Sequence, residues 1–142
     1  MTVSYTATSG DLTDLGQHTV NGTVTGAVSN CQDGTGNGIT SGTLSGTFTM
    51  KGNCEGEGAT GTTTYTWNGN THPPTSTVSE SANGNILGAS STGATVTGGL
   101  LTGYTVRTSG TDSNPIGAEL ACASPNGNTG GTGTGTVTFT GT

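Results

Sequence analysis

The fold is decided by the stretch Val20-Asn21-Gly22-Thr23-Val24-Thr25-Gly26-Ala27-Val28 and by its partner Ser41-Gly42-Thr43-Leu44-Ser45-Gly46-Thr47-Phe48-Thr49-Met50. If the two stretches pair as a hairpin that turns near Thr35, large residues face glycines across the strands. A large side chain opposite a glycine fills the space that the missing side chain leaves, and such pairs set strand register. We therefore interpret the glycines as packing partners in a strongly curved sheet. The predicted pairs are Gly22 with Phe48, Gly26 with Leu44, Val24 with Gly46, and Val20 with Met50.

The composition predicts one ordered all-β domain. The chain has 142 residues, which suits a single domain over residues 1–142. Only 27% of the residues are apolar and 4% are aromatic, which is thin for a packed core. Disordered chains of low hydrophobicity are usually rich in charge, whereas charged residues make up only 7% of this sequence. Threonine is abundant, and it favours strands because its branched Cβ suits the pleat.

The charge balance excludes two classes of partner. Lys51 and Arg107 are the only basic residues against eight acidic ones, and the net charge is −6. Nucleic acids and anionic membrane surfaces both need several cations on the protein, so we exclude them. No apolar run is long enough to span a bilayer, so we expect no membrane insertion. The remaining partners are a small molecule, a glycan or another protein.

The start of the chain and its low lysine content indicate export. The first residues, Met1-Thr2-Val3-Ser4-Tyr5, read as a strand rather than as a signal peptide. We therefore favour the mature form of a secreted protein to which Met1 has been added; the alternative is an intact chain that starts at Met1.

Eight stretches of alternating residues are separated by turn signals. One face of each stretch is apolar, which is typical of an antiparallel sheet over a core. Because eight is an even number, the first and last strands can pair antiparallel and close an up-and-down β-barrel. The alternative is a two-sheet β-sandwich with Greek-key connections. The stretches are 2–8, 18–30, 39–51, 59–68, 75–83, 93–108, 116–123 and 131–141.

The registers of the neighbouring hairpins are compatible with one another. A turn near Glu55 and another near His72 would bring the stretch 59–68 between its two neighbours. In the stretch 93–108 only Leu101 departs from the alternation. The predicted pairs are Thr63 with Phe48, Tyr65 with Gly46, Trp67 with Leu44, Val78 with Tyr65, Glu80 with Thr63 and, across a turn near Ser113, Arg107 with Glu119 on the outer face.

Three cysteines allow at most one internal disulfide. In the barrel, Cys54 and Cys122 both fall near the ends of descending strands and therefore at the same rim, whereas Cys31 falls at the opposite rim. We therefore favour a Cys54–Cys122 disulfide with Cys31 unpaired. The alternatives are a Cys31–Cys54 bridge, which needs another chain path, and three free thiols.

Glu80 is the sharpest anomaly in the pattern, because it shares a face with Val78 and Ala82, which should point inward. A carboxylate inside a small barrel would have a raised pKa and could act as an acid, a base or a polar anchor. The simpler interpretation is that Glu80 lies near a strand end, at the barrel mouth and in water. Its inward position still makes it a candidate ligand-binding residue.

Aromatic residues supply the other candidate ligand contacts. We expect Tyr65, Trp67 and Tyr104 on the inner face, where barrel mouths commonly hold a small ligand. The same three residues could instead simply form the core. They are our candidate binding residues together with Glu80.

The sequence favours a protein without catalysis, metal or cofactor. Glu55 and Glu57 could form a carboxylate pair, but a solvated turn is the simpler interpretation. The cysteines and histidines have no zinc spacing, and neither Gly-x-Ser-x-Gly nor His-Glu-x-x-His occurs. We therefore expect no catalytic residues, no metal site and no cofactor, although an enzyme that uses Glu80 remains a third hypothesis.

The run Tyr65-Thr66-Trp67-Asn68-Gly69, followed by Ser76-Thr77-Val78 and by the run from Ala94 to Gly103, resembles small secreted Gly/Thr-rich proteins of actinomycetes. The resemblance covers most of the chain from about residue 20. It implies a bacterial exported protein with an all-β fold, and no functional residue is transferred from it. Avidins and lipocalins resemble the expected barrel in architecture alone.

Two hypotheses follow for function. The first is a secreted, non-catalytic barrel that binds a small molecule in its mouth, or a glycan or protein through its loops. The second is a structural or defence protein, such as an inhibitor, adhesin or envelope component, that acts through its threonine-rich outer surface. A cavity above about 300 Å³ lined by Tyr65, Trp67 and Glu80 would favour the first. A filled interior with a regular outer threonine array would favour the second.

Overall fold

The glycine-rich hairpin forms as the sequence predicts. In the computed structural model, which describes residues 1–13, 16–69 and 71–141, strand β2 (His18–Val28) pairs antiparallel with β3 (Gly42–Asn53). All four predicted pairs are confirmed, with Gly22 opposite Phe48 and Gly26 opposite Leu44. A Cβ at Gly22 would overlap the Phe48 ring and lie 2.5 Å from the Thr6 carbonyl oxygen. The glycine therefore lets both the Phe48 ring and the neighbouring strand approach closely.

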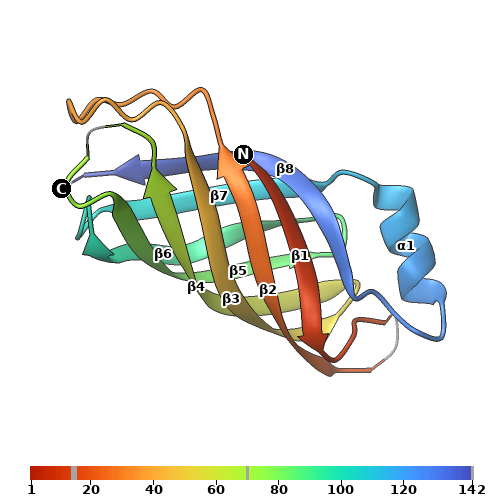
Figure 1. Ribbon diagram of the computed structural model, residues 1–142. Helices are drawn as coiled ribbons and strands as arrows, with labels where there is room; N and C mark the ends of the chain where they lie inside the picture. The colour runs from red at the N-terminus through yellow and green to blue at the C-terminus, as the bar shows by residue number, and fades with distance from the viewer. Residues whose placement is uncertain (14–15, 70, 142) are drawn as a thin grey trace.

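The described residues form a closed barrel of eight antiparallel strands, with one helix at one end (Figure 1). Each strand pairs with its neighbours in the chain, and β1 also pairs with β8. The predicted up-and-down barrel is confirmed, and the sandwich alternative is wrong. Closure leaves no sheet edge to pair with another chain. The remaining elements are β1 (Thr2–Ser9), β4 (Gly56–Trp67), β5 (Thr75–Asn85), β6 (Gly88–Gly99), β7 (Thr105–Asp112), α1 (Pro115–Ala123) and β8 (Gly130–Thr140).

Two of the predicted registers are displaced by two residues. Tyr65 lies opposite Leu44 instead of Gly46, and Glu80 lies opposite Gly61 instead of Thr63. The β3–β4 connection is a tight turn in which Asn53 pairs with Gly56, so β4 begins earlier than expected. A displacement of two residues keeps every side chain on its predicted face, because side chains alternate with a period of two. The other corrected pairs are Thr63 with Gly46, Trp67 with Gly42, Phe48 with Gly61 and Val78 with Thr63.

The predicted stretch 93–108 contains the end of one strand, a turn and the start of another. Strand β6 ends at Gly99 and β7 begins at Thr105. Leu101, the one residue that departed from the alternation, has a φ of 65°, in the left-handed region that tight turns use. The exception in the pattern therefore marked the turn.

The predicted strand over 116–123 is a helix. Asn114 caps α1 by accepting a hydrogen bond from the Gly117 amide (3.1 Å), and Pro115 occupies the first turn. An asparagine cap followed by proline is a strong signal for a helix start. Consequently the predicted Arg107–Glu119 pair is wrong, because Arg107 faces Thr138 of β8 while Glu119 lies on the helix.

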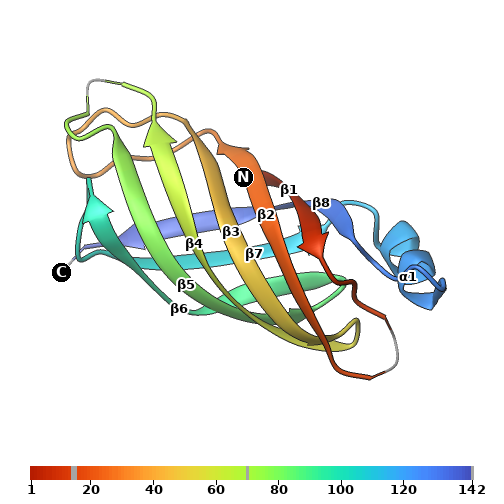
Figure 2. The same cartoon turned by 60° about the horizontal axis from the view of Figure 1, so that its bottom comes forward.

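The helix marks one end of the barrel, which we call the α1 end. Figures 1 and 2 show α1 beyond the strands, at the end where β1 runs into β2 and β3 turns into β4. The opposite end is filled by the larger hydrophobic core, in which Tyr65, Trp67, Val78, Val96 and Val106 are buried. A second, smaller cluster lies at the α1 end around Leu12, Val20 and the disulfide. The section between the two clusters contains the cavity described below.

Replacement of Gly22 by alanine tests the packing role of the glycines. The new Cβ would overlap the Phe48 ring and the Thr6 carbonyl, so we expect Gly22→Ala to lower the free energy of unfolding by about 1–3 kcal/mol. Urea denaturation is the measurement. Gly93→Ala is the matched control, since a Cβ there meets no atom within 4 Å. Equal stabilities of the two variants would contradict the packing role.

Candidate ligand-binding cavity

A cavity of about 290 Å³ occupies the barrel between the aromatic end and the α1 end. Its walls are largely apolar, and glycines reduce the number of side chains that enter it. On the β7–β8 side Gly110 faces Gly135, so neither strand contributes an inward side chain at that level. The apolar side chains around the cavity include Val3, Val24, Leu44, Phe48 and Met50.

Glu57 points from β4 into this cavity. It shares the inward face of β4 with Ala59, Gly61 and Tyr65, and burial raises its pKa to about 7. Among the described residues, its Oε2 atom is one of two buried side-chain polar atoms without a hydrogen-bond partner. The expectation of a solvated turn is therefore wrong for Glu57, whereas Glu55 is exposed in the turn.

Glu80 lies deeper in the cavity, in the middle of β5 rather than at a strand end. It pairs with Gly61 and Ala94, and the Thr108 hydroxyl of β7 donates a hydrogen bond to its Oε1. The register between β5 and β6 shifts on both sides of Glu80. Such irregularities re-aim side chains and are common beside functional sites. In this barrel the register shifts occur where Glu80 of β5 reaches past β6 to contact Thr108 of β7.

Tyr5 and Asp112 form a third polar group on the cavity wall. The Tyr5 hydroxyl donates to Asp112 Oδ2 (3.3 Å), and Asp112 Oδ1 accepts from the Asn114 amide (2.7 Å). Burial, followed by the negative charges of Asp112 and Glu57, raises the pKa of Tyr5 to about 12. Tyr5 therefore keeps its proton as a donor at neutral pH. The influence of two carboxylates on one phenol indicates a negative potential in this part of the cavity.

Three packed aromatic rings lie at the end of the barrel farthest from α1. The Tyr65 and Trp67 rings stack with centroids 5.4 Å apart, and Phe139 packs edge-on against both. The Trp67 indole donates to Ser76 Oγ (2.8 Å), and the Ser76 hydroxyl donates in turn to the Leu100 carbonyl (2.6 Å). These bonds fix the aromatic end as a packed floor.

Two of the four candidate binding residues line the cavity. Tyr65 and Glu80 do, whereas Trp67 and Tyr104 are not among the lining residues. Trp67 belongs to the packed floor, and Tyr104 lies just before β7 with its ring against Gly141. The ligand role expected for Trp67 and Tyr104 therefore does not fit their positions. Sequence reasoning passed over three lining residues, Tyr5, Glu57 and Asp112.

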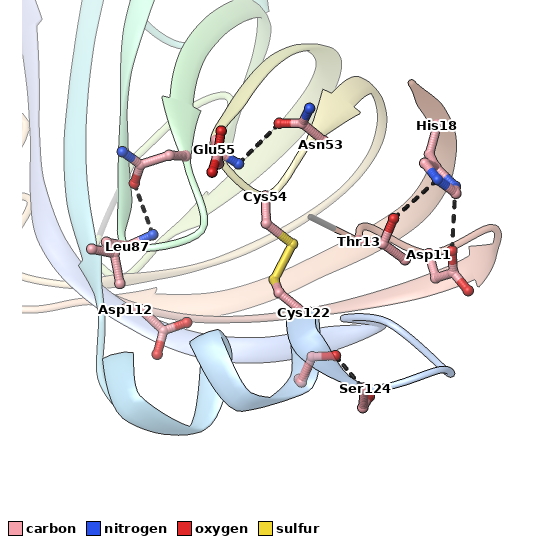
Figure 3. Close-up of a disulfide and its surroundings, with 12 residues drawn as sticks. Asp11, Thr13, His18, Asn53, Cys54, Glu55, Leu87, Asp112, Cys122 and Ser124 are labelled. Atoms are coloured by element: carbon pink, nitrogen blue, oxygen red, sulfur yellow. Dashed lines mark hydrogen bonds and ion pairs between the residues drawn. A yellow bond between two sulfur atoms is a disulfide. The ribbon is translucent and has the colours of Figure 1, made fainter. Parts of the chain in front are cut away.

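The α1 end is joined by a disulfide. Cys54 in the β3–β4 turn is bonded to Cys122 of α1 (Figure 3), so the predicted bridge is confirmed. Cys31 is free. The Cys54 amide donates to the Thr13 carbonyl, and its carbonyl accepts from the Ile86 amide, both at 2.9 Å. The bridge and these bonds join three loops and the helix. Closing a loop of this length typically contributes about 2–5 kcal/mol.

Histidine and acidic side chains also meet at the α1 end, outside the cavity. His18 Nδ1 lies 3.4 Å from Asp11 Oδ1, and its Nε2 lies 3.1 Å from Thr13 Oγ1 (Figure 3). Within residues 1–13, 16–69 and 71–141, no three His, Cys, Asp or Glu side chains are grouped so that they could hold a metal ion. The same ranges contain no helix with the length and apolar character needed to cross a bilayer.

Comparison with known proteins leaves the site to be interpreted from its own chemistry. No family model, no curated protein and no solved structure matches the chain. The resemblance to secreted actinomycete proteins therefore stays a prediction, and no residue role is transferred from a relative.

The raised pKa of Glu57 predicts a pH-dependent stability. Because the folded-state pKa of about 7 lies above the ordinary value of 4.5, the folded state holds the proton more tightly, and stability falls as pH rises from 4.5 to 7. Between pH 5 and pH 8 the wild type should lose roughly 1–2 kcal/mol of its free energy of unfolding relative to Glu57→Gln, which cannot titrate at this position. This value is smaller than the full pKa shift would give, because the side chain is partly exposed. Urea denaturation at both pH values measures this loss.

Glu55→Gln is the control for that measurement. It removes the same charge two residues away, from an exposed position in the turn. Its difference from the wild type should stay nearly constant between the two pH values. A constant difference for Glu57→Gln as well would contradict the buried, poorly solvated Glu57.

Proposed function

We propose that this protein is a secreted, non-catalytic binding protein that holds a small molecule inside its barrel. The cavity between the aromatic floor and the α1 end is the observation that carries the proposal. At about 290 Å³ it lies just below the usual range for ligand pockets, about 300–1,000 Å³. Eight-stranded barrels have an interior that is either filled by side chains or able to hold one small ligand.

The lining of the cavity supports the same interpretation. Ligand pockets are mostly apolar, with a few polar groups that fix the orientation of the ligand. Here apolar side chains such as Leu44 and Phe48 surround a small set of polar groups that includes Tyr5, Glu57 and Glu80. The buried Glu57 Oε2 atom has no partner among the described residues, and an unsatisfied buried acceptor is costly, so a ligand that donates a hydrogen bond to it would remove that cost.

Export is supported by the disulfide. Disulfides persist in oxidising compartments and are rare in the cytosol. The Cys54–Cys122 bridge fastens α1 to the barrel, so the rim of the proposed site depends on an oxidising environment.

The outer surface favours a second candidate, a structural or defence protein. Exposed hydroxyl side chains follow one another across neighbouring strands, because the register of each pair aligns them. Such a row could contact a glycan or an envelope component. One row contains Thr6, Thr23, Thr47, Thr62 and Ser79.

Filling the cavity separates the two candidates. Ala59 and Ala82 face each other on β4 and β5 and both line the cavity, so Ala82→Leu or Ala59→Leu places a larger side chain in it. In native mass spectrometry of protein purified from its own source, we expect the wild type to carry a bound small molecule. Both filled variants should lose it.

Ala27→Leu is the control, because Ala27 is exposed on the outer face of β2. It should retain the bound mass, and thermal unfolding should confirm that all variants fold. A wild type without bound mass, or filled variants that retain it, would contradict the proposal. A surface function would instead survive Ala82→Leu unchanged.

A further inference from the structure

The charges around the cavity are unbalanced. Glu57, Glu80 and Asp112 line it from three different strands, β4, β5 and β7. The two basic side chains of the sequence, Lys51 and Arg107, are both exposed. Met1 also lines the cavity, and its amino group donates a hydrogen bond to the Gly135 carbonyl oxygen (3.0 Å). The cavity wall therefore carries three acidic side chains and no basic side chain, so the negative charges outnumber the one positive charge of the Met1 amino group.

The three acids differ in what they already bind. Glu80 accepts a hydrogen bond from Thr108, and Asp112 accepts from Tyr5 and from the Asn114 amide. Glu57 Oε2 is buried and has no partner among the described residues. A donor carried by the ligand is therefore needed most at Glu57.

The rest of the cavity suits hydrocarbon. Val3, Val24, Leu44, Phe48 and Met50 surround it and offer no polar side-chain group to a ligand other than the Met50 thioether. A hard metal ion needs several oxygen ligands around it, and the described residues contain no three acidic, His or Cys side chains grouped closely enough to hold one. An organic molecule can place its charged group at Glu57 and its apolar part against these side chains.

We propose that the ligand of this cavity is an organic cation, a protonated amine with a compact hydrocarbon body whose ammonium group pairs with Glu57. The inference rests on the proposed function, since it names the class of molecule that the cavity holds. The ammonium group would satisfy the unpartnered Oε2 atom and offset the negative potential from Asp112. The hydrocarbon body would lie against Met50 and Phe48, which are nearer to Glu57 along the barrel than Leu44 is, since Met50 pairs with Ala59 on β4.

Binding of such a cation is coupled to release of a proton. Near neutral pH a large part of Glu57 is protonated, and a cation favours the ionised carboxylate, so binding should strengthen as pH rises through about 7. The other titratable groups on the cavity wall are the side chains of Tyr5, Tyr65, Glu80 and Asp112 and the amino group of Met1. Burial and neighbouring carboxylates raise the pKa values of Tyr5 and Tyr65, so both stay protonated over this range.

Three probes with the same body test the inference. Isothermal titration calorimetry would compare 1-adamantylamine, 1-adamantanol and adamantane-1-carboxylate, which differ only in the charged or polar group. We expect the wild type to bind the amine at least tenfold more tightly than the other two. From pH 6 to pH 8 the affinity for the amine should rise, by up to about tenfold, because this range spans the titration of Glu57.

Two variants assign the preference to Glu57. Glu57→Gln should bind the amine and the alcohol about equally, with no rise in affinity between pH 6 and pH 8. Glu55→Gln, which removes the same charge from the exposed turn, should keep the preference and the pH dependence of the wild type. Amine binding by Glu57→Gln equal to that of the wild type would overturn the assignment.

The outcomes distinguish this inference from the proposed function. If the alcohol or the carboxylate binds as tightly as the amine and Ala82→Leu abolishes that binding, the cavity binds small molecules without selecting for charge. That result overturns the cation inference and leaves the proposed function standing. If none of the three probes binds the wild type, the cation inference is overturned. The proposed function is overturned as well only if native mass spectrometry of the protein from its own source shows no bound small molecule.

Discussion

The interior of this barrel depends on what faces each inward glycine. Between β2 and β3 the inward glycines face large side chains, so that Gly22 accommodates the Phe48 ring and the strands pack closely. Between β7 and β8, Gly110 faces Gly135, and no inward side chain fills that level. With few apolar residues available, this arrangement gives a packed aromatic end and a cavity next to it. The same residue type therefore sets strand register in one place and creates space in another.

The strand faces could be predicted from the sequence more securely than the pairings. The β2–β3 register was correct because large residues oppose glycines there, and the alternatives would create clashes or gaps. The β3–β4 and β4–β5 registers were displaced by two residues, because only the turn length decided them and a two-residue displacement preserves every face. The strand predicted over 116–123 is wrong because the cap Asn114 and the following Pro115 start a helix there, whatever the alternation of the residues after them. The disulfide was nevertheless correct, since a helix at the same rim places Cys122 near Cys54.

The site was predictable only in part. Tyr65 and Glu80 line the cavity as the inward face of their strands indicated. The alternating pattern predicts a strand only from residue 59, so it leaves Glu57 in the preceding turn, although Glu57 has the same parity as Tyr65. Asp112 stands beside the turn predicted near Ser113 and is the last inward position of β7. Which carboxylates share one cavity depends on strands distant in sequence, and local patterns do not contain that information.

The carboxylates that line the cavity would be even less solvated if apolar side chains filled the space around them. Ionised carboxylates are poorly solvated in an apolar enclosure, and the pKa of Glu57 near 7 reflects that penalty. A crystal structure of the protein purified from its own source tests the central claim most directly. We predict density for a non-protein molecule between Glu57 and the side chains of Phe48 and Met50. An interior in which Tyr5, Phe48 and Met50 have moved inward and filled the space would contradict the account.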